Sequence, residues 1–483
     1  MSTINLLELI PDDRIKILGA ADLQLERLPA LVYPDEADAE KRVYASGVLR
    51  APLCRPENIS HRRDIARDFL ASGDLLDRLE QISAGAGEYR KAWQEDRKLL
   101  FAELHSEDGA NVSDIEGKFA MLKLNLRSFL KLSERLKELI DILASSTLYA
   151  EGLLEFKETC IKLYASHAFS DVPRAARLLE ADISDYTAEL LLGLNESLTV
   201  ESVNLNMLYT ASDADRNAQD DDDAGADSLS AHITAEELLP MLLAALDALG
   251  DHTVESCEAL IGLFQELYSE LRFYRFCLDF CRALSGAGAH YMFPQVTDAE
   301  SGVTSILALR DPLEVLSGEG GAVPHDILLT PERSGIVVTG PGGVGKTALL
   351  RAVCTAQILA QCGLPVICKD ASLSIRSGIF VSFTDVSDPN RDLLRRFESE
   401  AQAMAKIIDS LTPWALVALN ELFETVSFAD AADALYNIFS VMTQHNIAFF
   451  ATTHMPRLAE RFMEVDRITA MQMTAEGKLE PMQ

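Results

Sequence analysis

The sequence predicts an α/β domain, with a mostly parallel sheet covered by helices on both faces, preceded by an all-α region. First, short apolar runs alternate with amphipathic segments after residue 289, a pattern typical of strands joined by helices. Second, apolar residues recur every three or four positions along much of the chain before that point. Third, a glycine-rich motif at 340–347 follows one apolar run and begins a helical segment.

The α/β domain is expected to cover 289–483, because strand-type and helix-type segments alternate regularly there. Its strands are expected at 305–310, 335–340, 364–368, 379–383, 415–420 and 447–454. Its helices are expected at 346–362, 391–411 and 429–445.

The region before it reads as helices in several parts. Residues 1–110 are expected to form the N-terminal part of a helical core, 111–200 the first long helices, and 232–288 a returning long helix. Between them, 201–231 is acidic and contains few large apolar residues, so we expect a flexible, solvated insertion. Four consecutive acids at 220–223 could contact a divalent ion, but neighbouring carboxylates seldom converge on one ion.

Composition limits the classes of function. The formal net charge of −32 argues against general coating of nucleic acid, so any DNA contact needs a local basic patch. Cys277 and Cys281 lie one helical turn apart, a spacing compatible with a metal or redox pair but typical of small residues on a buried helix face. Free cysteines, no secretory signal and no bilayer-spanning apolar segment predict a cytoplasmic protein without membrane contact.

The motif GPGGVGKT at 340–347 predicts a binding site for a nucleoside triphosphate. Glycines let backbone N–H groups turn towards phosphate oxygens at the beginning of a helix, where negative charge is favoured. Lys346 is expected to reach the β- and γ-phosphates, and the Thr347 hydroxyl to bind Mg²⁺. The expected nucleotide-binding residues are Gly340, Pro341, Gly342, Gly343, Val344, Gly345, Lys346 and Thr347.

The run ALVALNEL at 415–422 is an apolar strand that ends in two polar residues. Glu421 is placed to act as a general base or to orient a water molecule. The preceding position commonly supplies a carboxylate to the magnesium shell, but Asn420 offers only a neutral amide oxygen. We therefore expect weak metal binding through Thr347 and Asn420, with slow hydrolysis.

The run FFATTH at 449–454 is a second apolar strand that ends in a polar side chain. A histidine at the end of a strand is often structural. Together with the two preceding motifs, however, His454 is expected to contact the γ-phosphate or the attacking water.

These motifs together resemble the ATPase domain of the MutS family, the mismatch-recognition proteins of DNA repair. The resemblance rests on VPHDILL and RSGIVVTGPGGVGKTALLR, on ILAQCGLPV, on FESEAQAMAKIIDSLTPWALVALNEL (397–422) and on FATTHMPRLAE. LCRPENISHRRDIARDFL, further upstream, is similar to the beginning of that family's helical core.

The resemblance implies an ABC-type ATPase domain preceded by core and lever helices, with ATP and Mg²⁺ as cofactors. It implies a homodimer formed through the ATPase domain, in which Arg395 and Glu400 lie on a signature helix that faces the partner's nucleotide. DNA, branched or mismatched, and a repair protein are the implied partners.

The sequence also departs from the family pattern. Gly342 stands where the family has Asn, Arg395 where it has a signature serine, and Ala322 where it has an aromatic residue that stacks on adenine. No mismatch-reading domain fits before the core, and the acidic insertion occupies the place of the DNA-gripping clamp. We therefore expect a shortened family member without a mismatch-recognition domain.

Three interpretations stay open. The first is a MutS-like ATPase whose nucleotide state drives rearrangement of the dimer and its lever helices in DNA repair or recombination. The second keeps the fold but treats the protein as a non-hydrolysing, ATP-dependent switch or scaffold for a partner. The third is an unrelated P-loop ATPase with helical arms, of the chromosome-maintenance type.

Overall fold

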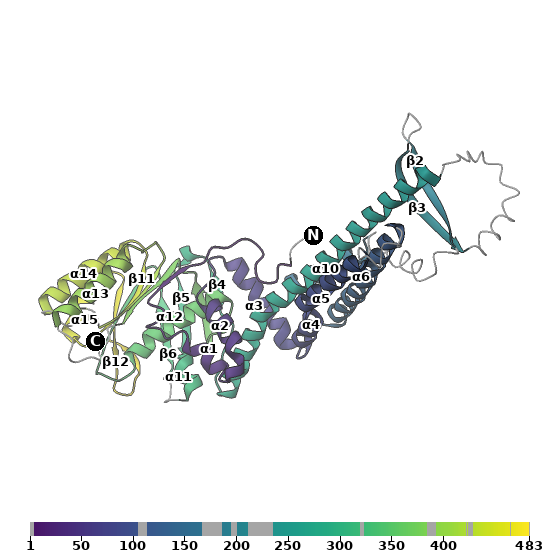
Figure 1. Ribbon diagram of the computed structural model, residues 1–483. Helices are drawn as coiled ribbons and strands as arrows, with labels where there is room; N and C mark the ends of the chain where they lie inside the picture. The colour runs from purple at the N-terminus through teal and green to yellow at the C-terminus, as the bar shows by residue number, and fades with distance from the viewer. Residues whose placement is uncertain are drawn as a thin grey trace. The chain divides into compact units, whose positions relative to one another are not determined.

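In the computed structural model the chain divides into two compact units. Figure 1 labels their helices and strands. The first unit takes in Met1–Ile4, Asp74–Leu148 and Leu154–Leu271, and the second takes in Asn5–Gly73, Tyr149–Leu153 and Arg272–Gln483. The structure describes residues 4–104, 114–166, 186–194, 200–210, 235–318, 323–383, 393–421, 423, 428–463 and 465–482.

The second unit is built around a seven-stranded sheet with the strand order β1-β9-β10-β11-β7-β12-β13. Its neighbouring strands are parallel except for β13, which runs antiparallel to β12. Every residue of β7, β10 and β11 is buried, as in a parallel sheet covered on both faces. The strands are β1 (Lys16–Leu18), β7 (Gly335–Thr339), β9 (Gly378–Phe383), β10 (Leu416–Asn420), β11 (Ala448–Thr453), β12 (Ile468–Met473) and β13 (Leu479–Pro481).

Helices cover both faces of this sheet, as predicted. Val417, Leu419 and Phe449 belong to a core cluster that also takes in side chains of α13 (Leu393–Ile408), α14 (Phe428–Gln444) and α15 (Pro456–Phe462). Alternate strand residues point to the opposite face, which α12 (Lys346–Cys362) covers. The three predicted helices of this domain are confirmed.

A smaller sheet of four strands, in the order β4-β8-β5-β6, also belongs to the second unit. Its strands are β4 (Gln295–Thr297), β5 (Thr304–Leu309), β6 (His325–Leu329) and β8 (Asp370–Ser374), and the short helix α11 (Pro312–Ser317) follows β5. The strand expected at 364–368 is wrong: only an isolated bridge between Val366 and Met292 forms there. Pro365 has no N–H to donate to a ladder, which disfavours a strand at that point.

The strand β1 corrects the prediction that only helices precede residue 289. Ile17 lies opposite Ile379, so β1 extends the large sheet from within the expected helical core of 1–110. Gly19 follows with φ 79°, and a Cβ there would lie 2.1 Å from the carbonyl oxygen of Val381. Only glycine therefore fits where the chain leaves this strand. The helices α1 (Arg27–Val32), α2 (Ala39–Leu49) and α3 (Pro56–Ala71) come next.

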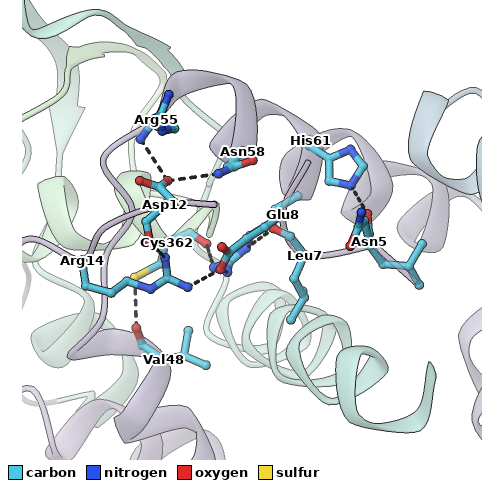
Figure 2. Close-up of polar contacts among 12 residues, drawn as sticks. Asn5, Leu7, Glu8, Asp12, Arg14, Val48, Arg55, Asn58, His61 and Cys362 are labelled. Atoms are coloured by element: carbon cyan, nitrogen blue, oxygen red, sulfur yellow. Dashed lines mark hydrogen bonds and ion pairs between the residues drawn. The ribbon is translucent and has the colours of Figure 1, made fainter. Parts of the chain in front are cut away.

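Side chains of α3 hold the segment before β1 by its backbone (Figure 2). The Asn58 side chain accepts a hydrogen bond from the Leu9 N–H at 2.8 Å and donates to the Ile10 carbonyl at 2.9 Å. It also donates to Asp12 at 3.2 Å, and Asp12 in turn accepts from the Arg55 N–H at 3.1 Å. Because Asn58 is fully buried, these bonds fix the path of the segment against α3.

Arg62, one turn further along α3, contacts three parts of the second unit. Its guanidinium donates to the Leu7 carbonyl at 2.9 Å and to the carbonyl of Cys362, the last residue of α12, at 3.3 Å. It also lies over the Phe273 ring, 4.8 Å from the centroid. Burial lowers the pKa of Arg62. Arg62 therefore joins the N-terminal segment to the end of the helix that begins at the glycine-rich loop.

The first unit contains the long helices that the apolar spacing predicts. They are α4 (Leu75–Ser83), α5 (Ala86–Leu104), α6 (Asp114–Ser145), most of α7 (Glu151–Tyr164) and the Ala235–Leu271 part of α10 (Ala235–Gly286). Lys118 of α6 pairs with Asp247 of α10 at 2.5 Å, and Arg90 of α5 pairs with Glu258 of α10 at 2.9 Å. None of the helices that the structure describes has the length and apolar character needed to cross a bilayer.

A two-stranded antiparallel hairpin corrects the all-α expectation for this region. It consists of β2 (Tyr186–Leu194) and β3 (Val200–Thr210), where helices were expected up to residue 200 and a flexible insertion after it. VNLNMLY, at 203–209, alternates apolar and polar residues at its start, a strand signal that the helical reading overlooked. Residues 211–231 of the expected insertion, with the acids at 220–223, lie outside the described residues.

The cysteine pair of α10 is part of a packed interior. Cys277 and Cys281 are 0% and 1% exposed, and all cysteines of the chain are free thiols. In the part of the chain that the structure describes, no group of three or more His, Cys, Asp or Glu side chains gathers to hold a metal ion. Both side chains thus lie on the buried face of α10, where the sequence pattern predicts small residues.

Candidate nucleotide site

The glycine-rich loop joins β7 to α12 and presents the first turn of that helix. A Cβ at Gly340, where φ is 148°, would lie 2.5 Å from the Met473 carbonyl oxygen of β12, so glycine is required there. Gly343 and Gly345 have φ of 75° and 103°, and a Cβ at either would meet no atom within 4 Å. The loop is thus an open cradle of backbone at a helix N-terminus, a geometry that suits phosphate.

Lys346 lies at the centre of this loop and is 4% exposed. Its Nζ donates to the carbonyl oxygens of Gly340 and Pro341, both at 2.9 Å. The same nitrogen lies 3.2 Å from His454 Nδ1 and 4.0 Å from Glu421 Oε1. The structure therefore brings the side chains of Lys346, Glu421 and His454 together.

His454 bridges Lys346 and Glu421. An ammonium group can only donate, so Nδ1 of His454 accepts from Lys346, which assigns the ring proton to Nε2. That Nε2 lies 2.5 Å from Glu421 Oε1. The imidazole side chain is 40% exposed whereas the carboxylate side chain is 11% exposed, so the pair lies at the mouth of the site.

Thr347 and Asn420 come together where the predicted metal ligands should meet. Asn420 is the last residue of β10, on the face that α12 covers, and its Oδ1 accepts from the Thr347 hydroxyl at 3.1 Å. The Thr452 hydroxyl of the adjacent strand β11 donates to the same oxygen at 2.8 Å. A hydroxyl and an amide oxygen are hard ligands that fit Mg²⁺, but neither carries a charge.

Glu421 is held in a backbone conformation that only a few non-glycine residues adopt. Its φ is 55°, in the left-handed region, and its side chain begins directly after the buried strand. Its N–H donates to the carbonyl oxygen of Thr452 at 3.1 Å and to the hydroxyl of the same residue at 3.2 Å. β11 therefore helps to aim the carboxylate towards the loop.

The two residues predicted to face a partner subunit both lie on α13. The side chain of Arg395 lies outside the described part of the chain. Glu400 is 6% exposed and accepts a hydrogen bond from the Phe423 N–H at 3.0 Å, within its own subunit. The trans role of Arg395 and Glu400 stays a prediction, whereas the intramolecular contact of Glu400 is one that sequence reasoning missed.

Sequence reasoning also missed His325, the first residue of β6. A pocket beside the loop is lined by His325, Glu314, Val323, Val344 and Ala348, among others. Burial lowers the pKa of His325, which keeps the imidazole neutral near pH 7. Its buried Nδ1 has no hydrogen-bond partner among the described residues. The sequence signal that could have identified His325 was the histidine of VPHD, which begins the strand preceding β7 and the glycine-rich loop.

Comparison with known proteins assigns a family to this part of the chain. The family model of MutS domain V matches residues 336–482. An Endonuclease MutS2 of Streptococcus gordonii is 31% identical over 176 residues, which cover 36% of this chain and 21% of that protein. The DNA mismatch repair protein MSH7 of Arabidopsis thaliana is 29% identical over 254 residues, or 47% of this chain and 23% of that protein. The chain thus spans about a fifth of the length of these curated relatives.

Proposed function

Since this chain is a member of the MutS family, with a domain V at residues 336–482, we propose that it binds ATP and hydrolyses it slowly. We further propose that its nucleotide state rearranges a homodimer and its long helices during DNA repair or recombination. The observation that carries this proposal is the placement of Lys346 within hydrogen-bond or ion-pair distance of the loop carbonyls, His454 and Glu421. The names of the MutS2 and MSH7 relatives support the repair context.

The loop and Lys346 would bind the phosphates. Backbone N–H groups of 342–346 would surround phosphate oxygens, and Lys346 would exchange its bonds to Gly340 and Pro341 for bonds to the β- and γ-phosphates. The helix α12, with 17 residues, adds the favourable end of its dipole. An ammonium group buried in the protein is costly unless paired, so a triphosphate is a well-matched ligand for it.

Thr347 and Asn420 would hold Mg²⁺, which when bound would neutralise charge on the phosphates. Their oxygens already meet at 3.1 Å, so both point to one place. The donor set fits the ion, because magnesium keeps several waters and takes phosphate oxygens as ligands. The donor set lacks the carboxylate that commonly stands at the position of Asn420. This absence supports weak metal binding and slow turnover.

Glu421 and His454 would act on the attacking water. Glu421 is the carboxylate nearest to Lys346 among those described in this site, and it can accept a proton from water. His454 donates from Nε2 to Glu421 and so fixes the carboxylate orientation. Movement of His454 towards the γ-phosphate would let the same N–H bind a phosphate oxygen.

His325 would contact the adenine base. Its neutral ring and the apolar side chains of Val323, Val344 and Ala348 form a surface next to the loop on which a flat ring can pack. The unpartnered Nδ1 offers a polar contact for a base edge. His325 would thus supply a ring in place of the aromatic residue expected at Ala322.

The wider assembly is proposed on the family resemblance. A homodimer formed through the ATPase domain would bring Arg395 of α13 towards the partner's nucleotide, while the buried Glu400 would keep its contact with Phe423 in its own subunit. Branched or mismatched DNA and a repair protein would be the partners, and the net charge of −32 requires that DNA meet a local basic patch.

The test is an ATPase assay with and without branched DNA, on the wild type, on Lys346→Ala and on Lys369→Ala, an exposed lysine of the same unit. We expect slow turnover in the wild type and Lys369→Ala, and its loss in Lys346→Ala. Stimulation by branched DNA at low salt would support the repair role, and equal rates in all three variants would contradict the assignment of the site.

A second function rests on Asn420. If the missing carboxylate abolishes turnover, the chain would act as a non-hydrolysing, ATP-dependent switch or scaffold for a partner protein. ATP-dependent dimerisation without phosphate release would favour this second function over the first. Membership of the MutS family argues against the unrelated chromosome-maintenance type of ATPase.

A further inference from the structure

The helix α13 contacts the chain just after β10 through Phe423. The Glu400 carboxylate accepts a hydrogen bond from the Phe423 N–H at 3.0 Å. One turn earlier, the Phe397 ring packs against the Phe423 ring, with centroids 5.7 Å apart at 49°. Glu400 is 6% exposed and Phe423 is 6% exposed, so both contacts lie inside the protein. Phe423 is therefore fixed to α13 by one polar and one apolar contact.

The backbone at this point is held in an uncommon conformation. Glu421 has a φ of 55° and Phe423 has a φ of 61°. Both values lie in the left-handed region, which residues other than glycine seldom adopt. Such a conformation persists only where surrounding contacts specify it. Two such contacts are present here. The Glu421 N–H donates to Thr452 of β11, and the Phe423 N–H, two residues further along the chain, donates to Glu400.

We propose that Glu400 is a positioning residue for Glu421 and acts through the backbone N–H of Phe423. This inference rests on the proposed function, because it concerns the aim of the carboxylate at the Lys346 and His454 site. A buried carboxylate that accepts a backbone N–H makes a charge-assisted hydrogen bond, stronger than that from a neutral group. Glu400 therefore sets the backbone from which the Glu421 side chain extends towards His454.

The same contacts would couple a movement of α13 to the position of the Glu421 carboxylate. A displacement of α13 would move the Glu400 acceptor and the Phe397 ring together, and both contact Phe423. Glu421 stands two residues before Phe423 in the chain, and its Oε1 lies 2.5 Å from Nε2 of His454. A small change in the backbone at Phe423 would therefore break this short contact. Nucleotide affinity should change little, since the loop and Lys346 belong to a different segment.

The experiment combines hydrogen exchange with nucleotide binding and turnover. Four variants are compared with the wild type: Glu400→Ala, Glu400→Gln, and the matched controls Glu398→Ala and Glu398→Gln, which change an exposed glutamate of the same helix. Exchange is followed at the Phe423 amide, with the Glu421 amide as an internal reference, because Thr452 rather than Glu400 accepts from it. This readout needs neither nucleotide nor turnover.

We expect the Phe423 amide to exchange about tenfold faster in Glu400→Ala, where the acceptor is lost, and the Glu421 amide to change much less. Turnover should fall about tenfold, with the ATP dissociation constant within about threefold of wild type. Glu400→Gln retains an amide oxygen that can accept the bond, so it should restore part of both effects. Both Glu398 variants should match the wild type.

Three results would overturn the proposal. Unchanged exchange at Phe423 in Glu400→Ala would show that Glu400 does not fix this backbone. Loss of ATP binding in parallel with turnover, or equal effects in the Glu398 variants, would show a general structural role instead. If the wild type itself shows no turnover, the proposed hydrolysis fails, while the exchange and binding results still decide the role of Glu400.

Discussion

Asn420 Oδ1 accepts a hydrogen bond from the Thr347 hydroxyl at 3.1 Å, where β10 ends beside the first turn of α12. The contact joins two motifs that lie more than seventy residues apart in the sequence. It places a neutral oxygen at the position where a carboxylate would best bind a magnesium ion. If the chain hydrolyses ATP as proposed, we expect its affinity for the ion, rather than the geometry of the site, to limit turnover.

Asn420→Asp should strengthen metal binding, because it adds a negative charge without changing the size of the side chain. The Thr347 and Thr452 hydroxyls can donate to a carboxylate as well as to an amide oxygen. We expect the Mg²⁺ concentration for half-maximal ATPase activity to fall about tenfold, with an increase in kcat. The measurement is a magnesium titration of steady-state turnover.

The control for that titration is Asn437→Asp, which makes the same chemical change on the exposed side of α14. It should titrate like the wild type. An Asn420→Asp variant with wild-type magnesium dependence would show that Asn420 does not lie in the metal shell.

His454→Ala should slow hydrolysis more than it weakens ATP binding. The substitution removes the imidazole, whose Nε2 lies 2.5 Å from Glu421 Oε1, and leaves that carboxylate less well oriented. We expect kcat to fall about 10- to 100-fold and the ATP dissociation constant to change less than about threefold. Single-turnover hydrolysis and equilibrium binding separate the two quantities.

His445→Ala, at an exposed position just beyond the end of α14, is the matched control and should behave like the wild type. A His454→Ala variant with full single-turnover activity would remove His454 from the proposed mechanism.

Asn58→Ala should destabilise the second unit, because it leaves the Leu9 N–H and the Ile10 carbonyl without their buried partner. We expect the free energy of unfolding in urea to fall by about 3 kcal/mol. Asn58→Asp should also destabilise the protein, since it would place a second carboxylate beside Asp12, which lies 3.2 Å from the side chain now.

Asn437→Ala, on an exposed helix face, provides the comparison and should change the free energy of unfolding by less than about 0.5 kcal/mol. Equal losses at the two positions would mean that the backbone contacts of Asn58 do not anchor the N-terminal segment.

The pH dependence of stability should carry a contribution from His325. Burial lowers its pKa in the folded state, while Asp326 opposes the shift. The unfolded chain therefore takes up a proton near pH 6.5 and the folded chain only at a lower pH. The stability that the neutral ring preserves is complete above about pH 6.5 and is lost as the pH falls through the folded pKa.

His325→Gln should flatten this part of the profile when the melting temperature is measured from pH 7.5 to pH 5. His445→Gln, which changes an exposed ring, should follow the wild type. Parallel profiles for His325→Gln and wild type would contradict the assignment of a neutral, half-buried imidazole.

The sequence was sufficient to predict the parts of the site that follow strong local patterns. The glycines of the loop and the polar residues at the ends of β10 and β11 stand next to long apolar runs, so their positions could be read directly. In a parallel sheet the carboxyl ends of such strands share one edge, and Lys346, Glu421 and His454 do meet there.

Other features depend on contacts between distant segments and left little trace in the pattern. β1 has only three residues, too few to show a period, and it forms a strand because β9 offers an edge. The family resemblance singled out Glu400 on its helix, but its hydrogen bond with the Phe423 N–H depends on a backbone turn that the sequence pattern does not show. His325 is recognised as a half-buried ring that lines the pocket only when β6 is placed beside the loop.

Single-turnover hydrolysis of ATP by the wild type and Glu421→Gln decides whether Glu421 activates the attacking water. We predict that both bind ATP with dissociation constants within about threefold, and that Glu421→Gln hydrolyses it at least about 100-fold more slowly. Equal rates of hydrolysis in the two proteins would contradict the assignment of Glu421 as the residue that activates water.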